Sequence, residues 1–194
     1  MEELAGRGDR VFLDLKFHDI PNTVAGAVAA ATRLGAWMIN VHASGGGPMM
    51  RAARDAAHAE AARLSRPAPL GSAVTMLTSL AEDALPQIGM AGPIAEQVAR
   101  LAALAQSAGL DGVVASPHEV QLIRRHCGSA FAVVTPGIRG AGDARGDQSR
   151  TMSAAEALAA GSTYLVVGRP ILAAPDPRAA AERIAAECRA ARTP

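Results

Sequence analysis

The stretch VFLDLKFHDIPNT, residues 11–23, decides the fold of this chain. Residues 11–15 form an apolar run bounded by charge and followed by a proline, which is typical of a buried strand that gives way to a loop. Because side chains alternate across a strand, Asp14 and Lys16 are predicted to share one face, and Asp19 follows three residues later, close enough to join them. Three charges at the rim of an apolar strand are costly to desolvate unless they pair. The cluster is therefore either a structural ion pair or a site that moves a proton.

Apolar strand-like runs and Ala-rich helical runs alternate along the rest of the chain. Strands that are apolar on both faces and alternate with helices indicate a parallel sheet covered by helices. Six such units in one register favour a (β/α) barrel over an open Rossmann sheet, and no Gly-x-Gly-x-x-Gly fingerprint follows the first strand. The unusual residue runs fall at the C-terminal ends of the expected strands, where a barrel carries its chemistry. The expected strands span residues 11–15, 37–41, 71–76, 112–115, 131–134 and 164–167, and the expected helices span 23–34, 48–64, 93–108, 117–126, 153–160 and 177–192.

Length and composition set outer bounds on the function. A chain of 194 residues predicts a single domain, residues 1–194, with a core made mostly of small aliphatic side chains because only 3% of the residues are aromatic. The formal net charge of +1 gives no electrostatic case for binding nucleic acid or an anionic membrane. The start lacks the apolar stretch of a secretory signal, and no apolar run reaches the roughly 18 residues of a membrane span. Cys127 and Cys188 lack ligand-like spacing, so a reduced, cytoplasmic setting is expected.

Residues 14–23, DLKFHDIPNT, resemble the signature of the orotidine 5′-monophosphate decarboxylase family. The resemblance implies a (β/α)8 TIM barrel of which only strands 3–8 are evident here. The family's chains normally open with two further strand–helix units, and nothing before Val11 predicts either strand, so an N-terminally incomplete barrel is expected. The motifs that extend the resemblance over nearly the whole chain are VHASGG at 41–46, LTS at 77–79, DGVV at 111–114, TPGIR at 135–139, GDQ at 146–148 and VGRP at 167–170.

The resemblance also implies an activity, the cofactor-free decarboxylation of orotidine 5′-monophosphate to uridine 5′-monophosphate in de novo pyrimidine biosynthesis. Lys16, Asp14 and Asp19 are the implied catalytic residues. An ammonium at Lys16 would stabilise the electron pair left on C6 when CO₂ departs and would then act as the general acid. Asp14 would lie near the departing carboxylate. Asp19, with Ile20 and Thr23, is implied to reach across a homodimer interface into the partner's site.

A substrate-binding set follows from the same resemblance. The resemblance implies that Thr78 and Ser79 contact the edge of the pyrimidine and its nearby polar groups. The segment 137–150 is expected to be a lid, and phosphate contacts are expected at its two ends and in the Gly-Arg pair after the last strand. The full implied set is Ile20, Thr23, Thr78, Ser79, Pro136, Arg139, Gln148, Gly168 and Arg169.

Three alternatives to this interpretation stay open, the last two of them set by the resemblance itself. For Thr78 and Ser79, which follow an apolar strand, the residues alone favour a turn or a helix cap over a contact with a ligand. The Asp-x-Lys-x-x-Asp spacing is shared with related sugar-phosphate decarboxylases and lyases that place Mg²⁺ on the carboxylates. A catalytically dead phosphate-binding or subunit-interaction protein would also fit a chain without the first two strands. None of the five histidines shows the paired spacing of metal ligands, so no metal site is expected.

Overall fold

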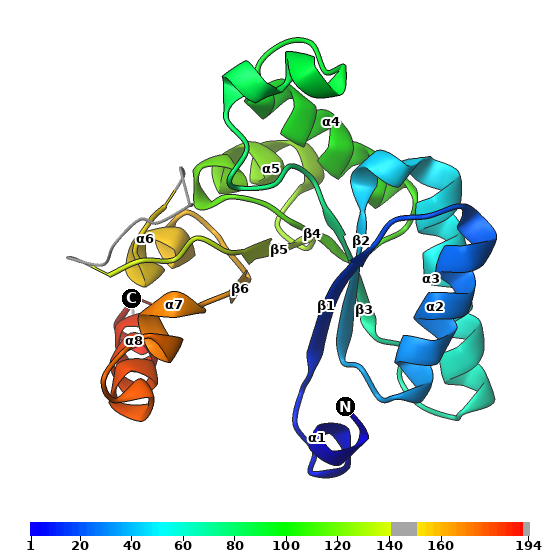
Figure 1. The fold of residues 1–194 in the computed structure, drawn as a ribbon, viewed down its shortest axis with the longest axis horizontal. Helices are drawn as coiled ribbons and strands as arrows, with labels where there is room; N and C mark the ends of the chain where they lie inside the picture. Colours follow the sequence, from blue (N-terminus) through cyan, green and yellow to red (C-terminus); the bar gives the residue numbers. More distant parts are fainter. Residues whose placement is uncertain (141–150, 192–194) are drawn as a thin grey trace. The chain divides into compact units, whose positions relative to one another are not determined.

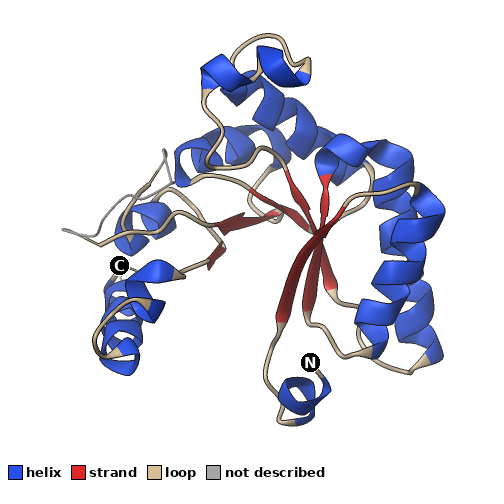
Figure 2. Ribbon diagram, viewed as in Figure 1, coloured by secondary structure: helices blue, strands red, loops and turns tan. Residues whose placement is uncertain are grey.

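The computed structural model describes residues 1–140 and 151–191, and in these residues it forms an α/β chain with six strands (Figures 1 and 2). The hydrogen-bonded order is β1-β2-β3-β4-β5-β6, and the pairings β1–β2, β2–β3 and β5–β6 are parallel. The chain divides into two compact units, Met1–Thr75 with Arg100–Val113 and Met76–Ala99 with Val114–Pro194. The strands are β1 Phe12–Phe17, β2 Met38–His42, β3 Leu70–Val74, β4 Gly112–Val114, β5 Ala132–Thr135 and β6 Tyr164–Leu165.

The first unit packs two helices, α2 (Pro21–Arg33) and α3 (Gly46–Arg63), side by side next to strands β1 to β3 (Figure 1). β2 and β3 pair in regular register from Met38↔Leu70 to His42↔Val74, whereas the β1–β2 register shifts between Leu13 and Phe17. A short helix, α1 (Glu2–Gly6), precedes β1, and a 3-10 turn, Ala43–Gly45, leads from β2 into α3. The fully buried side chains in this unit include Val24, Val28, Met38, Val41, Met49 and Met50.

The second unit contains β5, β6 and a small core between helices α6 and α8. Ile138, Ala154 and Ala157 form this core, and Ile184 and Cys188 pack against it. Helix α6 begins at a capping box, in which Ser153 Oγ accepts a hydrogen bond from the Glu156 N–H and the Glu156 carboxylate accepts one from the Ser153 N–H. The helices of this part of the chain are α4 Ile94–Ser107, which spans both units, α5 Val120–Cys127, α6 Ala154–Ala159, α7 Arg169–Leu172 and α8 Pro177–Ala190.

Arg124 on α5 ties together the chain segments that enter β5 and β6. Its guanidinium donates to the Gly161 carbonyl at 2.7 and 3.0 Å, to Thr163 Oγ1 at 2.9 Å and to the Phe131 carbonyl. Burial lowers the pKa of this guanidinium from its ordinary value, and these oxygens replace the water that the group has lost. Thr163 Oγ1 in turn accepts a hydrogen bond from the Val133 N–H, and this bond links the N-terminal ends of β5 and β6.

The predicted alternation of strands and helices is confirmed, with most boundaries shifted by one to three residues. Two local differences have simple causes. The expected helix 117–126 opens with a 3-10 turn, Pro117–Glu119, because Pro117 begins the turn and Ser116 Oγ accepts the His118 N–H. β6 is two residues long instead of four, although the Val166 N–H still donates to the Thr135 carbonyl. The single domain over residues 1–194 stays a prediction.

None of the described helices is both long and apolar enough to cross a membrane.

Candidate active site

The first group of predicted site residues lies at the end of β1. Lys16 Nζ lies 2.9 Å from Asp14 Oδ1, so the ion pair expected from the sequence is present. Both side chains keep about two fifths of their surface exposed, 39% for Lys16 and 42% for Asp14, so the pair lies at an accessible rim and not in the core. The pairing does not come from a regular strand, because the backbone of Lys16 has φ +52° at the point where the β1–β2 register shifts.

A third residue, Asn40 on β2, connects to both partners, and sequence reasoning missed it. Asn40 Oδ1 accepts a hydrogen bond from the Lys16 N–H at 2.7 Å, and Asn40 Nδ2 donates to Asp14 Oδ1 at 2.5 Å. Its side chain is fully buried. The available signal was a lone amide inside the otherwise apolar run MIN at the start of β2, because a buried polar side chain needs partners.

Two histidines stand next to this group. The rings of His18 and His42 have their centroids 5.3 Å apart. Burial, followed by the nearby His18 and Lys16, lowers the pKa of His42 from its ordinary value, while Asp14 acts in the opposite direction. The surroundings of His42 therefore favour its neutral form over its charged form. Gly45 leaves room for the His18 ring, since a Cβ there would lie 3.1 Å from His18 Cδ2 and closer still to the Met49 thioether.

The predicted residues Asp19, Ile20 and Thr23 lie just beyond β1, on the surface of the chain. Asp19 Oδ1 accepts a hydrogen bond from the Ile20 N–H at 2.6 Å, and among the described residues no ion pair joins Asp19 to Lys16. Ile20 is 68% exposed and Thr23 is exposed in the first turn of α2. Within one chain, therefore, the structure brings Asp14 and Lys16 together but leaves the second aspartate outside the pair.

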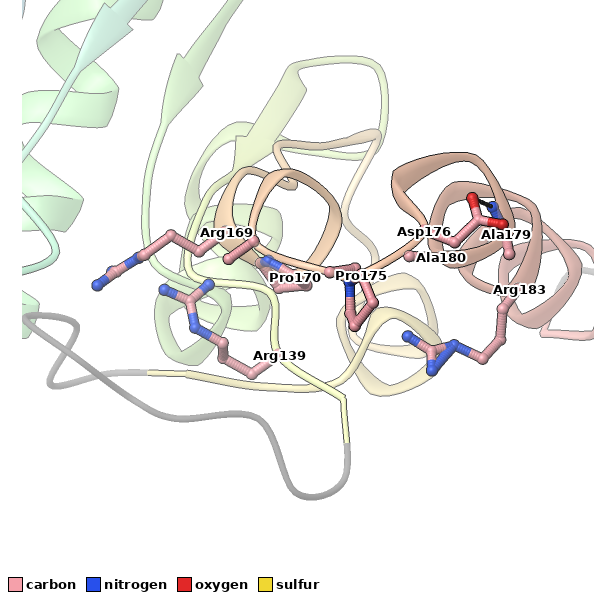
Figure 3. A pocket seen from close by; sticks show the side chains of 10 residues that line it. Arg139, Arg169, Pro170, Pro175, Asp176, Ala179, Ala180 and Arg183 are labelled. Carbon is pink, nitrogen blue, oxygen red and sulfur yellow. Dashed lines mark hydrogen bonds between the residues drawn. The ribbon is translucent and has the colours of Figure 1, made fainter.

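The second group of predicted residues lines a cavity of about 730 Å³ in the other unit. Arg139, which follows β5, and Arg169, which opens α7, both line it, and their side chains extend toward the same side in Figure 3. Arg139 is buried, its Nη1 donates to the Ile138 carbonyl at 2.7 Å, and its N–H donates to the Met152 carbonyl at 3.0 Å. Arg183 on α8 lines the far end of the cavity (Figure 3). The guanidiniums of Arg139 and Arg169, which extend toward the same side of the cavity, provide the charge and the forked donors that a phosphate dianion requires.

The remaining predicted residues are not among those that line this cavity, and one of them lies outside the described part of the chain. Thr78 is buried and Ser79 exposed, in the segment after β3. Pro136 directly follows β5, and Gly168 precedes Arg169 with its carbonyl accepting the Ile171 N–H. Gln148 and most of the expected lid lie in residues 141–150, outside the described residues.

Among the described residues, no group of three or more His, Cys, Asp or Glu side chains is arranged to hold a metal ion.

Comparisons with known proteins agree on one family. Residues 1–184 match the model of the "Orotidine 5'-phosphate decarboxylase / HUMPS family". The chain is 62% identical over 182 residues to the orotidine 5'-phosphate decarboxylase of Moorella thermoacetica, covering 93% of this chain and 72% of that protein. It is 56% identical over 191 residues to that of Halorhodospira halophila, covering 98% and 79%. The crystal structure of the Lactobacillus acidophilus orotidine 5'-phosphate decarboxylase superposes with a TM-score of 0.83 at 41% identity, covering 96% of this chain and 79% of that one. This chain, with its Asp14–Lys16 pair and its arginine-lined cavity on a TIM-barrel-type α/β fold, therefore belongs to the orotidine 5'-phosphate decarboxylase / HUMPS family.

Proposed function

We propose that this chain decarboxylates orotidine 5′-monophosphate to uridine 5′-monophosphate and CO₂, a step of pyrimidine biosynthesis. The observation that carries the proposal is the 62% identity to a decarboxylase of that name over 93% of the chain, with the Lys16–Asp14 pair intact. The substrate is thus a small nucleotide and not a nucleic acid, in line with a net charge of only +1.

The reaction needs a cation that can also give up a proton. Breaking the bond between C6 and the carboxylate leaves an electron pair on C6, and CO₂ departs as a neutral molecule. The Lys16 ammonium stabilises this developing charge and then transfers one proton to C6, which yields uridine 5′-monophosphate. Asp14 orients the ammonium through the 2.9 Å contact and lies near the departing carboxylate, where the like charges raise the energy of the bound substrate.

The phosphate is the proposed ligand of Arg139 and Arg169. Both line one cavity. A guanidinium offers paired donors to phosphate oxygens, and because it is planar and rigid it loses less conformational entropy per hydrogen bond than a lysine does. The sequence resemblance adds further substrate contacts for this proposal, namely Ile20, Thr23, Thr78, Ser79, Pro136, Gln148 and Gly168.

The direct test is turnover by the purified chain of residues 1–194. It is expected to consume orotidine 5′-monophosphate, followed as the loss of its absorbance, and to release uridine 5′-monophosphate and CO₂ in equal amounts. The same rate is expected after dialysis against a chelator, because Lys16 supplies the cation at C6. A rate that collapses with the chelator and returns with Mg²⁺ would favour a metal-dependent sugar-phosphate decarboxylase or lyase. No turnover under either condition would contradict the proposal and favour a ligand-binding protein.

We further propose that the active unit is a homodimer with shared sites. Asp19 and Thr23 are exposed just beyond the strand that carries Lys16, and next to them Ile20 exposes 68% of its surface and Leu15 on β1 exposes 59%, which together offer apolar surface for a second subunit to cover. In a two-fold dimer, Asp19, Ile20 and Thr23 of one subunit would complete the site of the other.

Subunit mixing tests the shared site. Lys16→Ala and Asp19→Ala chains are each expected to be inactive alone. Mixed dimers would contain one intact site, with Lys16 from one chain and Asp19 from the other, so random mixing should restore about a quarter of the parent activity. Mixing Lys16→Ala with Asp14→Ala is the control and should restore nothing, because both residues belong to one subunit's half. Restoration by the control pair, or none by the first pair, would contradict the shared site.

A cytoplasmic location is the final part of the proposal, supported by two free thiols, Cys127 and Cys188. Cell fractionation of the tagged chain checks it.

A further inference from the structure

We propose that Asn40 is a positioning residue for decarboxylation, a role that rests on the proposed function. One buried amide contacts both members of the Lys16–Asp14 pair: its oxygen accepts the Lys16 N–H and its nitrogen donates to Asp14 Oδ1. Neither contact touches the Lys16 ammonium. Asn40 therefore acts through its neighbours, by fixing where the carboxylate and the lysine backbone lie.

The Lys16 backbone needs this contact. Lys16 has φ +52°, a left-handed conformation that is unfavourable for any residue with a Cβ. It lies in the interval between Leu13 and Phe17 where the main-chain register with β2 shifts. The Lys16 N–H therefore finds its acceptor in the Asn40 side chain, 24 residues away in sequence. The left-handed backbone at Lys16 sets the direction of the lysine side chain, and the hydrogen bond to Asn40 Oδ1 stabilises this backbone conformation.

The position of the Asp14 carboxylate also depends on Asn40. Asp14 Oδ1 accepts both Asn40 Nδ2 and Lys16 Nζ, so one oxygen is held between a buried neutral donor and a mobile ammonium. Because Asp14 and Lys16 are about two fifths exposed, their ion pair alone would leave both side chains free to change rotamer. Asn40 is completely buried, away from bulk solvent, so its own orientation is fixed by these two partners.

The polarity of the amide is matched to the site. Flipping it would place its NH₂ against the Lys16 N–H and its oxygen against the Asp14 carboxylate, with both contacts repulsive. Asn40→Asp keeps an acceptor for Lys16 but sets a second carboxylate against Asp14. Asn40→Ala removes both contacts. The two variants thus separate the role of the oxygen from that of the nitrogen.

Lys16 is the only lysine in the sequence, which gives the experiment a clean probe. Chain labelled with ¹⁵N-lysine yields a single backbone amide signal, that of Lys16, whose hydrogen exchange reports the contact to Asn40 directly. In Asn40→Ala, exchange of this amide is expected to speed up at least about tenfold, and in Asn40→Asp it should stay close to the parent rate.

Kinetics provide the second readout. kcat is expected to fall about 100-fold in both variants, since small misplacements of catalytic groups have effects of this size, while KM changes less than about threefold. Ser72→Ala is the matched control: Ser72 is buried on β3 and donates to the Ile39 carbonyl at 3.0 Å, and among the described residues no hydrogen bond joins it to Asp14 or Lys16. It should leave both kcat and the Lys16 amide signal as in the parent.

Several results would overturn the positioning role. A folded Asn40→Ala chain with parental kcat would do so, as would unchanged exchange of the Lys16 amide. Equal losses in Ser72→Ala, or failure of both Asn40 variants to fold, would assign Asn40 to the core alone. An inactive parent chain would contradict the proposed function instead, and the amide exchange would still decide whether Asn40 holds the Lys16 backbone.

Discussion

Replacing Lys16 with alanine is expected to lower kcat for orotidine 5′-monophosphate by at least about 1,000-fold, because it removes both the cation at C6 and the proton donor. The fold should survive. Lys16 lies at the end of β1 with 39% of its side chain exposed, so the loss of its ion pair should change the free energy of unfolding by no more than about 1 kcal/mol. Single-turnover kinetics and a thermal unfolding curve measure the two quantities.

Two further variants sharpen this result. Lys16→Arg keeps the positive charge but provides a group that does not give up its proton, so it should bind substrate and remain nearly inactive. Arg7→Ala is the matched control, since it breaks another exposed ion pair between residues two apart, Arg7 to Asp9 at 3.5 Å, in the same unit. It should retain parental kcat. Turnover by Lys16→Ala at the parental rate would remove the chemical basis of the proposed function.

Replacing Arg169 with alanine is expected to lower kcat/KM about 100-fold, chiefly through KM, because the phosphate loses a charge-assisted, paired donor. Arg169 is exposed at the start of α7, so its removal costs little packing. The decisive measurement compares two ligands. Affinity for uridine 5′-monophosphate should fall with kcat/KM, while the weak affinity for uridine, which has no phosphate, should stay unchanged.

Arg183→Ala provides the control for this second prediction. Arg183 lines the same cavity from α8, at the end away from Arg139 and Arg169 (Figure 3), so its loss should change kcat/KM less than about threefold. Equal losses in the two variants would mean that only the general positive charge of the cavity matters. Equal losses for uridine and its phosphate in Arg169→Ala would mean that Arg169 does not contact the phosphate.

The positions of the elements could be read from local sequence. The strands and helices repeat with the two periods that the backbone imposes, and the described strands fall within one to three residues of their expected ends. The helix expected from Pro117 onward shows the limit of prediction from periodicity. Its first turn is 3-10, because the His118 N–H donates to Ser116 Oγ and this local hydrogen bond competes with the helical pattern. The periodicity of apolar residues does not reveal side-chain bonding of this kind.

The residues of the candidate site also fall into two groups, those that local sequence predicts and those that depend on tertiary contacts. The Asp14–Lys16 pair was predictable, since the two residues lie two positions apart and the pairing needs no distant partner. Asn40 was not, because its role depends on β2 lying beside β1 and on a register shift that turns the Lys16 N–H toward a side chain. Asp19 also differed from the simple expectation: its carboxylate turns back to the Ile20 N–H and stands apart from Lys16.

By itself, the sequence determined the order of the elements, the charged pair at the end of β1 and the family to which the chain belongs. These features depend on residues close together in the chain or on motifs that keep their order. Only the tertiary structure decided that a buried amide holds Lys16 and Asp14, and that Arg139 and Arg169 line one cavity although 30 positions separate them. Such contacts arise when strands pair and helices pack, and the spacing of residues along a chain carries no record of them.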